Sequence, residues 1–264
     1  MNQHKASFLF KRSTVAFALL LAGTAQAASW DFSNCSGILA SGQAWASTTA
    51  ASTTWNNDKC GQASEGVTID LRGYSTALPN SGTRVEAWSG SGIGYYTTGG
   101  ESSSNGTHSV DSNSGIDALI LKFSQDVALN SVKIGWNGSE NGSSTLNDSD
   151  LSIYRWEGTG APTASNGTAL TFSDTAWKLV NHIADVGSKT DNTASFSSSS
   201  SSYWLISAYN GNIGWSLGND AFKLLAVAGT VPSTPGVPEP GSLALIGLGA
   251  AGLLAARRRA VQRR

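Results

Sequence analysis

The sequence predicts an all-β fold, an antiparallel β-sandwich of the jelly-roll type, followed by a single C-terminal transmembrane helix. The segment 28–229 is rich in Ser, Thr, Gly and Asn and poor in charges, a composition typical of short strands joined by turns. About ten apolar or alternating segments occur in it, with turn residues roughly every 8 to 20 positions. No convincing amphipathic helix interrupts them, and two sheets packed face to face are therefore expected.

The N-terminal residues 1–27 have the three parts of a secretory signal peptide. Positive charges at Lys5, Lys11 and Arg12 precede an apolar run over residues 13–21, and an Ala-Gln-Ala sequence closes the segment. Small residues in this pattern are what signal peptidase cleaves. We expect export, with the mature chain beginning directly after this leader.

The two cysteines are Cys35 and Cys60. An even pair in an exported chain favours a disulfide, and no C-x-x-C spacing or further ligand suggests a metal or redox site. A bridge between them would close a loop of about 25 residues, worth ~3.5 kcal/mol in the chain-entropy description. It would anchor an N-terminal segment that has little else to hold it.

The expected strands follow in order along the chain. They cover residues 66–71, 83–88, 92–97, 117–123, 127–136, 151–156, 177–183, 193–197, 203–208 and 221–227. The polar sequence Ser124-Gln125-Asp126 predicts a turn between the fourth and fifth of them. The β-domain is expected to end at residue 229, and the Pro- and Gly-containing segment 230–236 to be a linker.

The C-terminal tail, residues 237–264, has three consecutive parts. Val237, Pro238, Glu239 and Pro240 come first, and Pro240 suits the first position of a helix because its missing N–H costs nothing there. The uncharged apolar run 241–256 would span roughly 24 Å as a helix, short of the usual membrane-spanning length of ~20 residues. The basic cluster Arg257, Arg258 and Arg259 follows; such side chains snorkel to lipid headgroups and mark a cytoplasmic end.

A Pro-Glu-Pro motif, a short apolar helix and a terminal arginine cluster together resemble the sorting tail of the PEP-CTERM family of Gram-negative surface proteins. The resemblance implies that the tail holds the exported precursor transiently in the inner membrane until an exosortase cleaves near the motif. The mature protein would then reach the cell surface or the extracellular matrix. The alternative is an ordinary tail anchor with a chance pair of prolines.

The mature domain and the two targeting ends differ in net charge. Once the leader and tail are set aside, nine basic residues remain against 17 acidic ones, for a net charge of about −8. Nucleic acids and anionic lipids both select basic surfaces. The composition therefore argues against a nucleic-acid partner.

One polar segment has the residue types of a calcium loop. Asp111 and Asp117 flank a run of Ser, Asn and Gly, and Asp148 and Asp150 lie further along the chain. Hard cations need several converging carboxylate and carbonyl oxygens, although the EF-hand spacing itself is absent. The arrangement, with His108 before it, is loosely similar to ectodomains of the PEP-CTERM family. Two interpretations stand: one Ca²⁺ bound by these four aspartates, or turns capped by their own side chains, with no cofactor required.

The aromatic residues suggest either a core or a glycan-binding surface. The pairs at 95–96 and 203–204 are informative, because neighbours on a strand point to opposite faces and one of each pair must leave the core. We take Tyr95 and Trp204 as candidates for stacking on sugar rings. The alternative is that both fill the core.

No catalytic residue is predicted, and the chain is expected not to be an enzyme. Residues 214–218 match the G-x-S-x-G pattern around Ser216, but no histidine follows that serine, as the nucleophile elbow requires. The preferred function is an exported, non-enzymatic surface or matrix protein that contributes to biofilm and exopolysaccharide. The alternative is a secreted carbohydrate-binding module.

Overall fold

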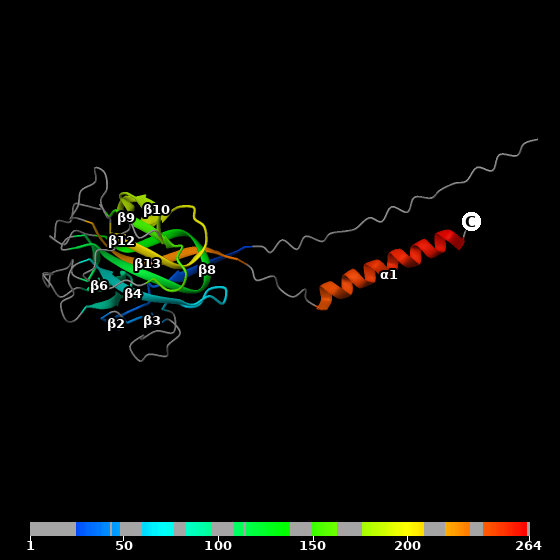
Figure 1. The fold of residues 1–264 in the computed structure, drawn as a ribbon, viewed down its shortest axis with the longest axis horizontal. Helices are drawn as coiled ribbons and strands as arrows, with labels where there is room; N and C mark the ends of the chain where they lie inside the picture. Colours follow the sequence, from blue (N-terminus) through cyan, green and yellow to red (C-terminus); the bar gives the residue numbers. More distant parts are fainter. Residues whose placement is uncertain are drawn as a thin grey trace, which may run out of the picture. The chain divides into compact units, whose positions relative to one another are not determined.

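The computed structural model of the protein describes residues 25–42, 44–47, 60–76, 83–96, 108–112, 115–137, 149–162, 176–208, 220–232 and 240–262. The chain forms two units, one of which is the β-domain, Ala25–Pro232; the helix α1 belongs to the other. Figure 1 labels strands of the β-domain and the helix α1. Each is described by itself below.

The β-domain contains thirteen described strands, all paired antiparallel. They are β1 (Gln26–Asp31), β2 (Gly37–Ser41), β3 (Ala46–Ser47), β4 (Ile69–Ser75), β5 (Arg84–Trp88), β6 (Gly92–Tyr96), β7 (Val110–Asp111), β8 (Asp117–Asn137), β9 (Leu151–Trp156), β10 (Trp177–Ile183), β11 (Thr193–Ser195), β12 (Ser201–Ala208) and β13 (Ala221–Val231). Two short 3-10 turns, Val186–Ser188 and Thr190–Asn192, precede β11.

The strands form two sheets that share β8. In the first sheet, the C-terminal half of β8 pairs with β13 and β11, and the sheet continues from β13 through β6, β5 and β2 and also includes β1 and β7. In the second sheet, the N-terminal half of β8 pairs with β4 and β12, and the strand order is β10-β9-β12-β8-β4-β3. In Figure 1 β8 is the long green strand that runs through the domain. The all-β, antiparallel expectation is confirmed.

The expected turn at Ser124-Gln125-Asp126 is wrong, because β8 runs through it without a break. The Ser124 N–H donates to the Thr68 carbonyl at 3.0 Å, and the Thr68 N–H donates to the Ser124 hydroxyl at 3.1 Å. These bonds keep the polar segment in the sheet while β8 passes from one sheet to the other. Ser124, Gln125 and Asp126 are polar because β8 is exposed to solvent where it passes between the two sheets.

The main core contains the inward faces of both sheets. Trp30 of β1 packs edge-on against Phe123 of β8, with ring centroids 4.7 Å apart, and its indole N–H donates to the Val67 carbonyl at 2.9 Å. Gly73 of β4 lies directly against the Tyr95 ring, where a Cβ atom would overlap the ring. Aromatic side chains from separate strands therefore interlock at the centre.

A second apolar cluster lies on the other face of the second sheet. Along β8 and β12 the residues alternate between the two clusters: Leu119 and Trp204 belong to the main core, whereas Ile120 and Leu205 belong to the second cluster. This alternation is the period of two expected of a strand. The second sheet thus carries apolar side chains on both faces.

The disulfide between Cys35 and Cys60 is formed, as expected, with both residues buried and their Cα atoms 4.8 Å apart. It joins the segment after β1 to the segment before β4. The Gly61 N–H donates to the Asp31 carbonyl at 2.9 Å beside it, so backbone bonding fixes the same junction.

The helix α1 spans Pro240–Gln262 and begins at the predicted proline. It is longer than the expected segment 241–256, because it continues through the arginine cluster. None of the described helices is long and apolar enough to cross a membrane, so the expected transmembrane helix is not supported. Its apolar part is short and contains glycines at 247, 249 and 252, which add no hydrophobic side chain.

Candidate functional site

A cleft of about 500 Å³ opens where β9 ends and β12 begins. It is lined by Asp126, Arg155, Trp156, Glu157, Gly158, Gly160, Ala161, Ser200, Ser201, Ser202 and Tyr203. The lining comes from three places in the chain: the crossing segment of β8, the β9 end with the turn after it, and the serine run before β12. Adjacent antiparallel strands bring these three segments together.

The ring of Trp156 is held in a fixed orientation at the cleft. Its indole N–H donates to the Gly160 carbonyl at 2.9 Å. Gly158 lies against the indole so closely that a Cβ atom would overlap it. Trp177 packs edge-on against the same indole, with ring centroids 5.1 Å apart. The half-buried indole therefore presents a rigid apolar surface at the rim.

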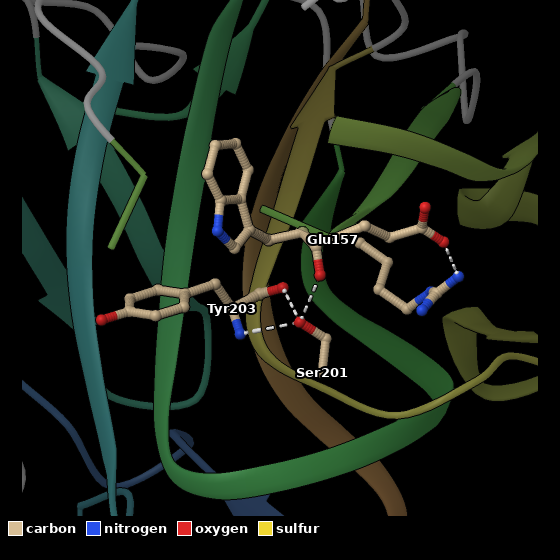
Figure 2. A network of polar contacts seen from close by, with 5 residues as sticks. Glu157, Ser201 and Tyr203 are labelled. Carbon is tan, nitrogen blue, oxygen red and sulfur yellow. Dashed lines mark hydrogen bonds and ion pairs between the residues drawn. The ribbon is translucent and has the colours of Figure 1, made fainter. Parts of the chain in front are cut away.

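The hydroxyl of Ser201 joins the end of β9 to the start of β12, as Figure 2 shows. It lies 2.8 Å from the Trp156 carbonyl and 3.0 Å from the Tyr203 carbonyl, and it accepts the Tyr203 N–H at 3.1 Å. This local bonding accompanies an irregular register between β12 and β8 at residues 201–203. It holds the backbone of Tyr203, whose side chain is half-buried.

The charges at the cleft are of both signs. Arg155 and Glu157 form an ion pair in the lining, and Asp126, which also lines the cleft, is exposed. Two aromatic rings, carboxylates and serine hydroxyls thus surround one hollow. Such a set can stack against the apolar face of a ring and exchange hydrogen bonds with hydroxyl groups at its edge.

The outer face of the second sheet continues from the cleft beyond Tyr203. Trp45, just before β3, has its ring centroid 6.4 Å from that of Tyr203. The Arg72 guanidinium lies 4.8 Å, and the Lys122 ammonium 5.7 Å, from the Trp45 centroid. Lys122 is paired with Asp70 at 3.1 Å. We call Trp45, Arg72 and Tyr203 the cationic patch.

A separate polar cluster lies on the outer face of the first sheet. Glu86, 8 % exposed, pairs with Arg84 and with His108 Nδ1, the latter at 2.9 Å. The His108 ring stacks on Tyr96 with centroids 4.4 Å apart. Burial, followed by the charges of Arg84 and Lys223, lowers the pKa of His108 below its ordinary value.

Lys223 of β13 lies between two tryptophan rings in the same cluster. Its ammonium is 4.7 Å from the Trp88 centroid and 4.1 Å from the Trp136 centroid. Burial lowers the pKa of Lys223 to about 8, and the side chain is 6 % exposed. Ring quadrupoles stabilise the charge that solvent no longer reaches.

The two residues predicted to stack on glycans are in the core instead. Tyr95 and Trp204 are both 0 % exposed, and the Trp204 indole N–H donates to the carbonyls of Val127 and Ser201 at 3.1 and 3.0 Å. Sugar cannot reach either ring. The outward members of the two pairs are Tyr96 and Tyr203, and only Tyr203 lines the cleft.

Three of the four predicted calcium ligands are buried. Asp111, Asp117 and Asp150 are each at most 5 % exposed, whereas Asp148 lies outside the described residues. Among the residues that the structure describes, no group of three or more His, Cys, Asp or Glu side chains is placed to hold a metal.

Buried aspartates instead organise the backbone at this end of the domain. Asp150 Oδ1 accepts the Asp185 N–H at 2.8 Å, and Asp220 Oδ1 accepts the Asp150 N–H at 3.0 Å. Sequence reasoning missed Asp220, because its neighbours along the chain show no metal-ligand pattern. These bonds agree with the alternative of aspartates that cap backbone groups.

The remaining predicted residues belong to the tail or lie outside the described parts. Val237, Pro238 and Glu239 are outside them, as is Ser216, while Pro240 is the first residue of α1. Arg257, Arg258 and Arg259 are exposed on the last turns of that helix. Their charges suit a helix C-terminus, where the backbone dipole is negative.

Residues 236–259 match the family model of the PEP-CTERM protein-sorting motif. The predicted resemblance of the tail is thereby confirmed. The motif implies an exported protein with a C-terminal sorting signal that an exosortase processes. A search of curated proteins finds no match for this chain.

Proposed function

We propose that the protein is a non-enzymatic surface or extracellular-matrix component that is exported, cut from its tail by an exosortase, and incorporated into a biofilm rich in exopolysaccharide. The observation that carries this proposal is the order of parts: a sorting motif at residues 236–259 follows directly on a β-domain that ends with β13 at Val231. The β-domain is therefore the part that reaches the cell surface or matrix, and the tail is the sorting signal.

The disulfide and the composition support delivery outside the cytoplasm. Disulfides persist in oxidising compartments such as the periplasm and the cell surface. A mature domain with few charges and many Ser, Thr and Asn residues is suited to contact with hydrated polymers through hydrogen bonds.

Tail variants in the producing bacterium test the sorting step. Replacing Pro238 and Pro240 by alanine should leave a full-length precursor in the cell envelope, while the mature form disappears from the surface and medium. The matched control replaces Pro232 and Pro235, two prolines ahead of the motif, and should be processed normally. Normal processing of the Pro238/Pro240 variant would refute recognition of the motif.

A second candidate function is carbohydrate binding at the cleft. The observation favouring it is the pairing of two oriented aromatic rings, Trp156 and Tyr203, with carboxylates and hydroxyls around one hollow of about 500 Å³. Saccharides offer an apolar ring face and a hydroxylated edge, which such a site matches. A Trp156→Ala variant that binds a glycan array as well as the unchanged protein would count against it.

A further inference from the structure

Three half-buried aromatic side chains share the outer face of the second sheet. Trp45, Trp156 and Tyr203 all pack against the second apolar cluster, and each keeps part of its surface accessible to solvent. The buried side chains of that cluster come from β4, β8, β9, β10 and β12, so the three rings lie on one continuous platform. Accessible aromatic rings gathered on one face of a sheet are suited to contact with a ligand.

The strand register places these rings in a row that crosses the strands. Arg155 faces Trp204 across the β9–β12 pair, so the next position sets Trp156 opposite Tyr203, on strands about 4.8 Å apart. Trp45 comes from the other side of β8, where β4 and β3 lie. Its ring centroid is 6.4 Å from that of Tyr203. The order across the sheet is therefore Trp156, Tyr203, Trp45.

The ring of Trp45 is held in place by the cations beneath it. The Arg72 guanidinium lies 4.8 Å and the Lys122 ammonium 5.7 Å from its centroid. Both side chains come from strands of the sheet, so they occupy the side of the indole that faces the sheet, and Arg72 Nε and Nη2 are enclosed there. Cation–π contacts fix the orientation of the ring. The cationic patch therefore presents a rigid apolar surface to solvent, as Trp156 does at the cleft.

The charges of this face are engaged within the protein. Lys122 is paired with Asp70 at 3.1 Å, and the Arg72 fork lies beneath the Trp45 indole. A nucleic acid would need several accessible cations along its path, and a polyanionic sugar would meet the same lack. A row of aromatic rings corresponds instead to the apolar faces of uncharged sugar units.

We propose that Trp156, Tyr203 and Trp45 form one linear binding surface for an extended, unbranched, neutral polysaccharide with β-linked rings, whose chain crosses the strands of the second sheet. This inference rests on the second candidate function; it adds Trp45, which lies outside the cleft, and names the ligand class. β-Linked sugars form a flat ribbon whose units can stack on successive rings, whereas α-linked chains coil away from a flat face. The ligand then spans roughly three consecutive units, one for each ring.

The test follows binding as the oligosaccharide grows. The purified full chain is titrated with β-linked gluco-, manno-, xylo- and N-acetylglucosamine oligomers from dimer to hexamer, and with α-linked gluco-oligomers of the same lengths. We expect the tetramer of at least one β-linked series to bind about tenfold more tightly than its dimer, as one further stacked ring predicts, with no further gain at the hexamer. The α-linked series, which differs from the β-linked gluco-series only in its linkage, should show no such gain.

Variants then locate the gain on the platform. Trp45→Ala should remove the difference between dimer and tetramer and leave dimer binding unchanged, whereas Trp45→Phe, which keeps an apolar ring, should retain most of it. Trp156→Ala should weaken binding at every length. The matched control is Trp136→Ala, because Trp136 is also half-buried and also contacts a lysine, Lys223, but lies outside this platform. It should change neither quantity.

The outcomes separate this inference from the function on which it rests. Equal affinity for dimer and tetramer, or a gain that survives Trp45→Ala, would overturn the linear surface and leave a glycan-binding cleft at Trp156. Failure of every oligomer to bind would refute both. Self-association of the chain that Trp45→Ala abolishes, without binding of any oligomer, would also overturn the inference and assign the three rings to a protein contact.

Discussion

Trp204 and Tyr203 are neighbours on β12, and the structure assigns them opposite roles. Trp204 is fully buried and its indole N–H bonds to two carbonyls, whereas Tyr203 is half-buried at the cleft. Truncation of the first should therefore remove stability, and truncation of the second should remove binding. The pair tests which face of β12 meets a ligand.

The size of the stability effect follows from burial. Replacing a core tryptophan by alanine costs about 3–5 kcal/mol, and the carbonyls of Val127 and Ser201 lose their donor as well. For a domain of this size each kcal/mol lowers the melting temperature by about 2–4 °C. Trp204→Ala should therefore melt roughly 6–20 °C lower, whereas Tyr203→Ala should lose only about 1 kcal/mol.

Calorimetry and glycan titration measure both quantities on the same samples. Well below its melting temperature, Trp204→Ala should keep the affinity of the unchanged protein for any glycan that binds, and Tyr203→Ala should lose it. The reasoning would be refuted if Trp204→Ala melted within a degree of the unchanged protein and lost its ligand, because that ring would then be a contact surface.

Three further predictions concern stability. The double variant Cys35→Ser, Cys60→Ser should lose ~3.5 kcal/mol in denaturant unfolding; an unchanged midpoint would show that the bridge constrains little. Gly94→Ala places a Cβ atom on the His108 carbonyl and should cost about 1–3 kcal/mol, which a melting curve identical to that of the unchanged protein would contradict. Burial lowers the pKa of Lys223 from 10.5 to about 8, so between those values the unfolded chain binds more protons. Unfolding free energy should then rise with pH, by at most ~1.4 kcal/mol per unit, relative to Lys223→Met, and the difference should be flat below pH 8.

Several strands were predictable from sequence because packing there follows the local pattern. Leu151–Trp156 and Trp177–Ile183 match the predicted boundaries of β9 and β10. In β9 the residues alternate between the two apolar clusters, as the sequence pattern indicates. β1 was missed because it begins at Gln26, inside the predicted leader. Its residues pair with β13 more than 190 positions away, and no local window contains that information.

The sequence predicts that an aromatic ring is exposed on β12, but not which residue supplies it. The rule that neighbours on a strand face opposite ways correctly required one of Tyr203 and Trp204 to leave the core. Which one leaves depends on the register of β12 against β8, and that register shifts between Ser201 and Tyr203. A one-residue slip exchanges the two faces, and the pairing of Trp204 with Leu121 therefore decides which aromatic ring lines the cleft.

Long-range contacts also explain the polar residues that sequence reasoning missed. Arg72 looked like an ordinary strand residue until β3 brought Trp45 beside it. Lys223 occupies an outward position of β13, and only the pairing of β13 with β8 and β6 encloses it between two indoles. Charge burial of this kind is a property of the assembled sheets.

The most direct test of the central proposal is the intact mass of the protein recovered from the cell surface and from the culture medium. We predict a species that begins near Ala28 and ends close to the Pro238-Glu239-Pro240 motif, without the arginine cluster. A mass that still includes residues up to Arg264 in the recovered protein would contradict processing by an exosortase.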